Sequence, residues 1–430
     1  MKINMKIEDK DIKTVVPPLR FPEFRDAEGW EETTLNRVST RITDKVGNLN
    51  LTPVSISAGS GFVTQAEKFG RDISGEQYKN YIILNHGDFA YNKGNSKKYP
   101  QGCICKLTEF DRIAAPNAFI CFRFKENVVP DFYKGYFDQN YHGKQLQRFI
   151  TSSARSDGLL NISPNDFFTI VVPTPRDLKE QKKIADCLGS LDDLISAVTD
   201  KIETLKEYKK GLMQQLFPAE GKTIPALRFT EFQNAGEWES KTLSDVCKLV
   251  RGPFGGALKK EIFVESGYAV YEQSHAIYEN TSTFRYYITK DKFNELIRFA
   301  VRPNDIIMSC SGTMGKFSII PKNYMEGVIN QALLKLSTKK GNDYRFIKYV
   351  LELPSNQKQL LSDAAGGAIK NIASVSQIKE MPLLIPNLKE QQQIANCLSS
   401  VDILISSEID KLDQLKAHRK GLMQKLFPTL

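Results

Sequence analysis

The sequence predicts an α+β fold in which two similar mixed α/β domains are separated by two long helices that pair as an antiparallel, pseudo-two-fold coiled coil. Three observations predict this fold. Residues 178–218 align without a gap to residues 388–428, and 25 of 41 positions are identical. Both segments carry apolar residues at coiled-coil spacing, and the segments outside them contain short strand-like runs. A duplication of this length indicates a chain built from two half-chains.

The repeated segments are predicted to be helices. Their apolar residues alternate at spacings of three and four, which keeps one seam facing a partner helix. Each helix ends at a Phe-Pro pair, because proline cannot continue a helix. Lys209 and Arg419 interrupt the seam at equivalent positions, and a polar residue there commonly fixes register. We assign helix pairing to Ile184, Leu188, Leu191, Ile195, Val198, Ile202, Leu205 and Leu212, and to Ile394, Leu398, Val401, Ile405, Leu412, Leu415 and Leu422.

The alternative arrangement is two independent helices, each lying on its own globular neighbour. The narrow seam favours pairing, because a helix that covers a globular core carries a broader apolar stripe. Apolar residues off the seam, namely Leu194, Ile403, Leu404 and Ile409, indicate a second contact face on which another protein can dock.

The globular segments also repeat at their edges. Residues 19–24 match residues 227–232, and Trp30 matches Trp238. Runs rich in β-branched and aromatic residues, such as 102–107 and 305–309, predict strands, and residues 132–150 and 344–361 predict helices with core aromatics. We divide the chain into an N-terminal extension (1–16), a first recognition domain (17–177), a spacer helix (178–218), a second recognition domain (219–387) and a second spacer helix (388–430).

The composition is typical of a soluble globular protein, with 41% apolar and 25% charged residues. No run of 18 apolar residues occurs, and the charged N-terminus is unlike a secretory signal, so we expect a cytoplasmic protein. The seven cysteines are scattered without a CxxC pair and there are only four histidines, so we expect no metal site.

The net charge of +9 is concentrated outside the helices. Residues 1–177 hold 24 Lys/Arg and 21 Asp/Glu, and residues 218–387 hold 22 and 17. An acidic partner, nucleic acid above all, would therefore meet the globular segments.

Three possible catalytic motifs each lack residues that the corresponding chemistry requires. Residues 59–62 resemble the glycine turn of an S-adenosylmethionine-dependent methyltransferase, but no (N/D)PP(Y/F) tetrad accompanies them, so we expect an ordinary turn. Residues 312–316 hint at a phosphate loop, but Cys310 replaces its first glycine and Phe317 replaces its Ser/Thr. Asp88 and Lys93 lack the further carboxylates that a nuclease metal site needs.

Polar, basic, glycine-containing loops remain as candidate DNA contacts, because lysines pair with phosphates and amides read base edges. The alternative is that these loops are simply solvated, which is the usual fate of charge clusters. The candidate residues are Tyr91, Asn92, Lys93, Asn95, Ser96, Lys97, Lys98, Ser153 and Arg155 in the first domain, and Arg251, Lys259, Lys260, Ser309, Ser311, Thr313, Lys316, Lys370 and Asn371 in the second.

The chain resembles the specificity subunits of type I DNA restriction–modification enzymes. The resemblance rests on LRFPEF and LRFTEF at 19–24 and 227–232, the stretch 302–316, the Asn-Gln-Ala-Leu run at 330–333, the P-x-L-K-E-Q helix start at 386–391 and the KGLMQ-x-LFP helix ends. It covers nearly the whole chain from about residue 17. The first domain departs from the pattern, because residues 91–98 replace the serine-glycine stretch and Asn117-Ala118 lacks the intervening glutamine.

The resemblance implies a non-catalytic DNA-recognition subunit. Each globular domain would read one half of a bipartite, asymmetric double-stranded DNA target, and the paired helices would set the gap. Two modification subunits would dock along the helices and use S-adenosylmethionine to methylate adenine, and restriction subunits would add Mg- and ATP-dependent translocation and cleavage. No cofactor is expected on this chain itself.

Two rival interpretations remain open. One is a coiled-coil adaptor whose globular domains bind protein, which would select no bipartite DNA motif. The other is an active enzyme, a fused nuclease or methyltransferase, which the missing tetrad and missing carboxylate cluster argue against.

Overall fold

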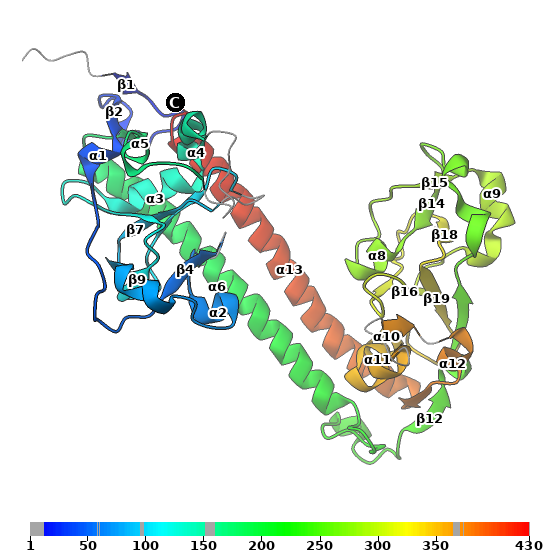
Figure 1. Ribbon diagram of the computed structural model, residues 1–430. Coiled ribbons are helices and arrows are strands. Elements are labelled where there is room, and N and C mark those ends of the chain that lie inside the picture. Colours follow the sequence, from blue (N-terminus) through cyan, green and yellow to red (C-terminus); the bar gives the residue numbers. More distant parts are fainter. Residues whose placement is uncertain are drawn as a thin grey trace, which may run out of the picture. The chain divides into compact units, whose positions relative to one another are not determined.

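The computed structural model describes residues 13–57, 59, 61–94, 99–150, 160–363, 370–372 and 374–429. The chain divides into two compact units (Figure 1): Met1–Thr199 with Asp410–Leu430 form unit 1, and Asp200–Ile409 form unit 2. The two breakpoints are equivalent positions of the repeat, since Thr199 and Ile409 are 210 residues apart. Each unit therefore holds one globular head, part of the helix that follows it and part of the other long helix.

The two long helices are α6 (Leu178–Leu216) and α13 (Leu388–Leu426). Within each unit their segments run antiparallel. In unit 2 Lys201 contacts Glu408 and Lys209 contacts Asp402. Residues further along α6 therefore contact residues nearer the start of α13, as in an antiparallel pair. Every residue assigned to helix pairing from the sequence is buried or half-buried, whereas most positions between them are exposed. The two copies therefore cover each other's seam, as the coiled-coil spacing predicts.

Head 1 is the globular part of unit 1 that precedes α6, and its described residues form four small sheets connected by short helices. Its four-stranded sheet has the order β3 (Ser39–Arg41), β10 (Ile120–Phe124), β7 (Phe89–Asn92) and β8 (Cys103–Lys106), with all neighbours antiparallel. The other sheets are β1 (Thr14–Val15), β2 (Trp30–Thr34) and β11 (Val171–Thr174); β4 (Val54–Ser57) and β5 (Gly61–Thr64); and β6 (Ile82–Asn85) and β9 (Arg112–Ala115). The helices are α1 (Leu35–Val38), α2 (Gln65–Phe69), α3 (Pro130–Asp138), α4 (Tyr141–Leu146) and α5 (Pro164–Phe167).

Head 2 repeats this plan. Its four-stranded antiparallel sheet has the order β13 (Cys247–Arg251), β19 (Leu333–Thr338), β16 (Ile306–Ser309) and β17 (Phe317–Ile319). The other sheets are β12 (Glu239–Thr242) and β22 (Pro382–Ile385); β15 (Tyr287–Ile288), β14 (Tyr268–Tyr271) and β18 (Gly327–Ile329); and β20 (Leu361–Asp363) and β21 (Lys370–Ile372). The helices are α7 (Leu243–Val246), α8 (Gln273–Ile277), α9 (Lys290–Glu295), α10 (Tyr344–Glu352), α11 (Pro354–Leu360) and α12 (Val375–Lys379).

Each head shares its core with the helix pair. In unit 1 the core joins Trp30 and Phe132 of the head to Leu188 of α6 and to Leu426 and Phe427 at the end of α13. In unit 2 the equivalent core joins head residues to both helices and includes Leu216, Phe217, Trp238, Ile394 and Leu398. Complete burial of such side chains contributes about 1.5–3 kcal/mol each, so head and helices fold as one unit.

Two predicted helices are each broken in two. The helix expected over 132–150 stops after α3, because Asn140 takes a left-handed φ of 55° before α4 begins. The helix expected over 344–361 divides at Pro354, since a proline disfavours helical backbone in the residue before it. The aromatic residues of these segments are largely buried, as expected. Across the described ranges, no helix is long and apolar enough to cross a bilayer.

Candidate nucleic-acid interface

The strand ends of the four-stranded sheet in head 2 meet at one edge. β13 ends at Arg251 opposite Leu334, β16 ends at Ser309 opposite Leu333, and β17 begins at Phe317 opposite Met308. This edge, here called the reading edge of head 2, also receives the backbone of Asn330, whose N–H donates to the carbonyl of Tyr271 at the end of β14. Loops that are far apart in the sequence are thus brought together.

The loop between β16 and β17 is the most elaborate part of this edge. Ser309 is buried, and its hydroxyl donates to the carbonyl of Thr313 at 2.7 Å and accepts from the N–H of Lys316 at 3.0 Å. Gly312 and Gly315 have φ of 62° and 70°, a backbone that favours glycine. Ser309 therefore shapes the loop, while the side chains of Ser311, Thr313 and Lys316 are exposed.

The β13 end supplies cationic and aromatic groups to the same edge. Gly252 lies so close to Asn330 that an added Cβ would sit 1.8 Å from its carbonyl oxygen. Arg251 is half-buried beside Cys310; burial raises the pKa of that thiol to about 11, and Arg251 opposes the rise. Beyond the turn, Lys259 and Lys260 are exposed, and the ring of Phe254 is 84% exposed. Lysines of this kind suit phosphates, and an exposed ring suits base stacking.

Head 1 builds the corresponding edge with different residues. β7 ends at Asn92 opposite Cys103 of β8, and the Asn92 side chain accepts from the N–H of Gly94 at 2.9 Å. Asn92 and Lys93 are half-buried at this edge. Arg41, exposed at the end of β3, lies opposite Phe122 and was not among the sequence candidates. Gly59 lies between β4 and β5, and Gly61 is the first residue of β5, paired with Ser57 at the end of β4.

Two sequence candidates are corrected by their burial. Tyr91 is fully buried; its ring stacks on Phe167 with centroids 4.8 Å apart, and its hydroxyl donates to the carbonyl of Gln101. Ser309 is likewise enclosed, so neither side chain can contact a duplex in this conformation. Asn95, Ser96, Lys97, Lys98, Ser153 and Arg155 lie outside the described residues. Lys370 and Asn371 belong to the backbone of β21.

The acidic candidate of head 1 has a structural partner. Asp88 is buried and its carboxylate accepts from Arg123 at 2.6 and 2.8 Å and from the N–H of Asn85. In head 2 Asp305 is buried in the same hairpin position and accepts from Ser337 and from the N–H of Arg302. These carboxylates brace hairpins, and no set of three metal-ligating side chains gathers within the part of the chain that the structure describes.

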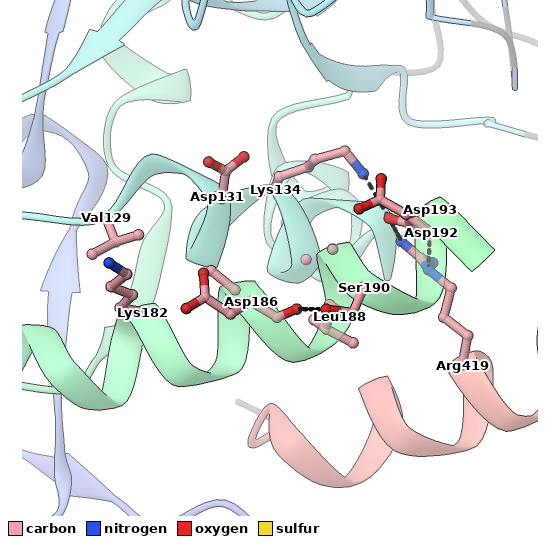
Figure 2. A pocket seen from close by; sticks show the side chains of 13 residues that line it. Val129, Asp131, Lys134, Lys182, Asp186, Leu188, Ser190, Asp192, Asp193 and Arg419 are labelled. Carbon is pink, nitrogen blue, oxygen red and sulfur yellow. Dashed lines mark hydrogen bonds and ion pairs between the residues drawn. The ribbon is translucent and has the colours of Figure 1, made fainter. Parts of the chain in front are cut away.

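A pocket of about 500 Å³ marks where head 1 meets the helix pair (Figure 2). Arg419 reaches from α13 to Asp192 of α6 at 2.5 Å and to Asp138 of α3 at 2.9 Å. Lys134 of α3 contacts the same two carboxylates. The acidic partners raise the pKa of Arg419 despite its burial, which acts to lower it. The polar seam position thus joins both helices to the head.

Unit 2 contains the equivalent joint with different chemistry. Lys209 of α6 contacts Asp402 of α13 at 2.7 Å and lies over the ring of Tyr349, 5.0 Å from its centroid. The Tyr349 hydroxyl of α10 donates to the same carboxylate at 2.6 Å. In both units a seam cation therefore connects one helix to the other and to the head.

Comparisons with known proteins agree with this architecture. Residues 235–417 match the family described as type I restriction modification DNA specificity domain. The type I restriction enzyme MjaVIII specificity subunit of Methanocaldococcus jannaschii is 26% identical over 67% of this chain and 68% of its own length. The putative MjaX specificity subunit of the same organism is 24% identical over 83% and 81%.

Solved structures show the same fold. The type I restriction-modification S subunit from M. genitalium superposes with a TM-score of 0.59 at 14% identity, covering 97% of this chain and 100% of that one. A chain from a study of type I R-M complex assembly and conformational transition gives a TM-score of 0.52 at 16% identity, covering 94% and 98%. Residues 235–417 thus match the DNA specificity domain of type I restriction–modification systems, and the chain as a whole is similar to type I specificity subunits and shares their fold.

Proposed function

We propose that this chain is the non-catalytic DNA-reading subunit of a type I restriction–modification complex, with each head reading one half of a bipartite double-stranded target. The observation that carries the proposal is the edge common to both heads, where strand ends of one sheet present polar loops. The groups at the two edges differ: head 2 presents exposed Ser311, Thr313 and Lys316, whereas head 1 presents half-buried Asn92 and Lys93 and exposed Arg41. Unlike edges imply unlike half-sites, so the target is asymmetric.

The paired helices set the gap between the half-sites under this proposal. Two modest half-site affinities joined by a stiff spacer reinforce each other through effective concentration, but only where the spacing fits. Because the DNA groove repeats about every 10 base pairs, a fixed spacing selects one gap. The buried cores and charged joints that tie each head to both helices supply the stiffness that such a spacer needs.

The modification subunits dock along the helices in this scheme. Leu194, Ile403, Leu404 and Ile409 remain 40%, 69%, 54% and 39% exposed on α6 and α13, off the seam. An exposed apolar group of this kind suits a protein partner. S-adenosylmethionine belongs to these subunits, and Mg and ATP belong to the restriction subunits of the complete complex.

Selection from random duplex DNA tests the proposal. The chain is co-purified with its modification subunits and allowed to select from a randomised duplex library. We expect two short, unlike motifs separated by a fixed unread gap, and no methyl transfer when the chain is incubated alone with S-adenosylmethionine. Recovery of no motif would favour the adaptor interpretation, and methylation by the chain alone would show that it is itself an enzyme.

A further inference from the structure

Gln273 stands at the reading edge of head 2 on a braced helical turn. It is the first residue of α8 and is separated from the end of β14 by Glu272 alone. The Nδ1 atom of His275 accepts from the N–H of Glu272 at 2.8 Å, and its Nε2 lies 2.9 Å from the carbonyl of Thr283. Since Nδ1 accepts, Nε2 carries the proton and donates. His275 is buried and stacks on Phe284, so the turn that carries Gln273 is fixed on both sides.

The side chain of Gln273 is oriented by the loop between β16 and β17. The hydroxyl of Ser311 donates to its Oε1 at 2.5 Å and so ties the amide to this loop. Gly312, with a φ of 62°, lies against the same amide, and a Cβ there would be 3.4 Å from Nε2. Two separate segments of head 2 thus hold this amide in position.

The amide retains hydrogen-bonding capacity on its outer side. Oε1 has a second lone pair, and within the described ranges no acceptor is paired with Nε2. The side chain is half-buried and lines a depression of about 530 Å³ together with Ser274, Thr283 and Arg285. An amide held in place with free hydrogen-bonding capacity is suited to reading a base edge, because a positioned side chain discriminates better than a mobile one.

We propose that Gln273 reads one adenine of the half-site recognised by head 2, accepting from adenine N6 through Oε1 and donating to N7 through Nε2, with Ser311 as its positioning residue. This inference rests on the proposed DNA-reading function. A glutamine–adenine pair of this kind discriminates against other bases by roughly 5- to 150-fold.

The test is the base preference of substituted complexes in the duplex selection. With Gln273→Ala we expect one adenine position in one half-site to lose its preference, while all other positions and the gap stay unchanged. With Gln273→Glu we expect that position to change from adenine toward cytosine, because a carboxylate accepts from cytosine N4. With Ser311→Ala the adenine preference weakens severalfold but the preferred base stays the same.

Gln359→Ala is the matched control, since this glutamine of α11 lines a pocket with Phe217 and Trp238 beside the helices. It should leave every position unchanged. If the unsubstituted complex selects a bipartite motif but Gln273→Ala and Gln273→Glu keep it intact at all positions, Gln273 does not read a base, while the DNA-reading function stands. If the unsubstituted complex selects no motif, the proposed function itself fails.

Discussion

Arg20 and Glu180, 160 residues apart in the chain, form a buried two-pronged ion pair: Nε donates to Oε1 at 2.6 Å and Nη2 to Oε2 at 2.7 Å. The indole N–H of Trp30 donates to the same carboxylate at 3.1 Å. Unit 2 repeats the arrangement with Arg228, Glu390 and Trp238. The doubled Leu-Arg-Phe, Trp and Lys-Glu-Gln positions therefore mark one junction, between the opening of each head and the first turn of the helix that follows it.

Removing one partner of this pair should cost more than removing both. Glu180→Met leaves a buried guanidinium without its anion and should lower the free energy of unfolding of unit 1 by about 3–5 kcal/mol. The double substitution Arg20→Met with Glu180→Met should cost less than Glu180→Met alone, because no buried charge is left unpaired. Urea denaturation of the unsubstituted protein, the two single variants Arg20→Met and Glu180→Met, and the double variant measures these free energies of unfolding. If the loss in the double variant equals the sum of the losses in the two single variants, the prediction is refuted.

Gly135 of α3 is predicted to be intolerant of any side chain. A Cβ there would lie 2.8 Å from the Leu188 side chain and 3.0 Å from the Phe427 ring, so Gly135→Ala forces these two packed side chains to shift. We expect a loss of about 1–3 kcal/mol in the stability of unit 1. Gly211→Ala on α6 is the control: nothing lies within 4 Å of its Cβ position, and a helical alanine should add about 0.5–1 kcal/mol. Equal effects from the two substitutions would contradict the packing described.

The seam cation of unit 1 should tolerate lysine but not an apolar residue. Arg419→Met removes the hydrogen bonds to Asp192 and Asp138 and should destabilise unit 1 by about 1.5–3 kcal/mol. Arg419→Lys should retain much of that stability, since Lys209 fills the equivalent position opposite Asp402 in unit 2. Thermal unfolding compares the variants, and a lysine variant as unstable as the methionine variant would show that charge alone does not hold the joint.

His142 is expected to make unit 1 sensitive to mild acid. Burial lowers the pKa of this imidazole to about 3, whereas the unfolded chain titrates near the ordinary value of about 6.5. Between these values the unfolded state binds the extra proton, so stability is full above about pH 6.5 and falls as the pH drops toward 3. The loss between pH 7.5 and 5.5 is about 1.4 kcal/mol. In urea denaturation at these two pH values, the His142→Leu variant should lack this loss in the free energy of unfolding. If the variant and the unsubstituted protein show the same pH dependence, groups other than His142 cause the loss.

Much of the fold can be predicted from the sequence because its signals are local or repeated. The spacing of apolar residues predicts both long helices, since a seam must return every three to four positions. Helices α6 and α13 begin at the predicted residues 178 and 388 and end at Leu216 and Leu426, two and four residues before the predicted ends. The break at Asn140 could not be foreseen, because it depends on one residue taking a left-handed backbone. Residue-level sites depend on contacts between distant segments.

Tyr91 and Gln273 show two ways in which the sequence alone does not identify the residues of a site. Tyr91 precedes a basic, glycine-containing loop, a position that predicts a DNA contact, but Phe167 and the carbonyl of Gln101 hold it in the core. The sequence around Gln273 does not indicate a DNA contact, because its neighbours are neither basic nor rich in glycine. Its role depends on Ser311, which lies 38 residues away. A polar residue directly after a predicted strand was the one signal that could have identified it.

The most direct measurement of the spacer mechanism shortens both helices by one heptad at equivalent positions, deleting 196–202 and 406–412 so that the seam keeps its register. The deletion removes about 10 Å of helix, or roughly three base pairs of DNA length. In the duplex selection we expect the same two half-site sequences with a gap shortened by about three base pairs, or loss of binding. Selection of the original gap by the shortened complex would contradict a helix pair that sets the distance between two DNA-reading heads.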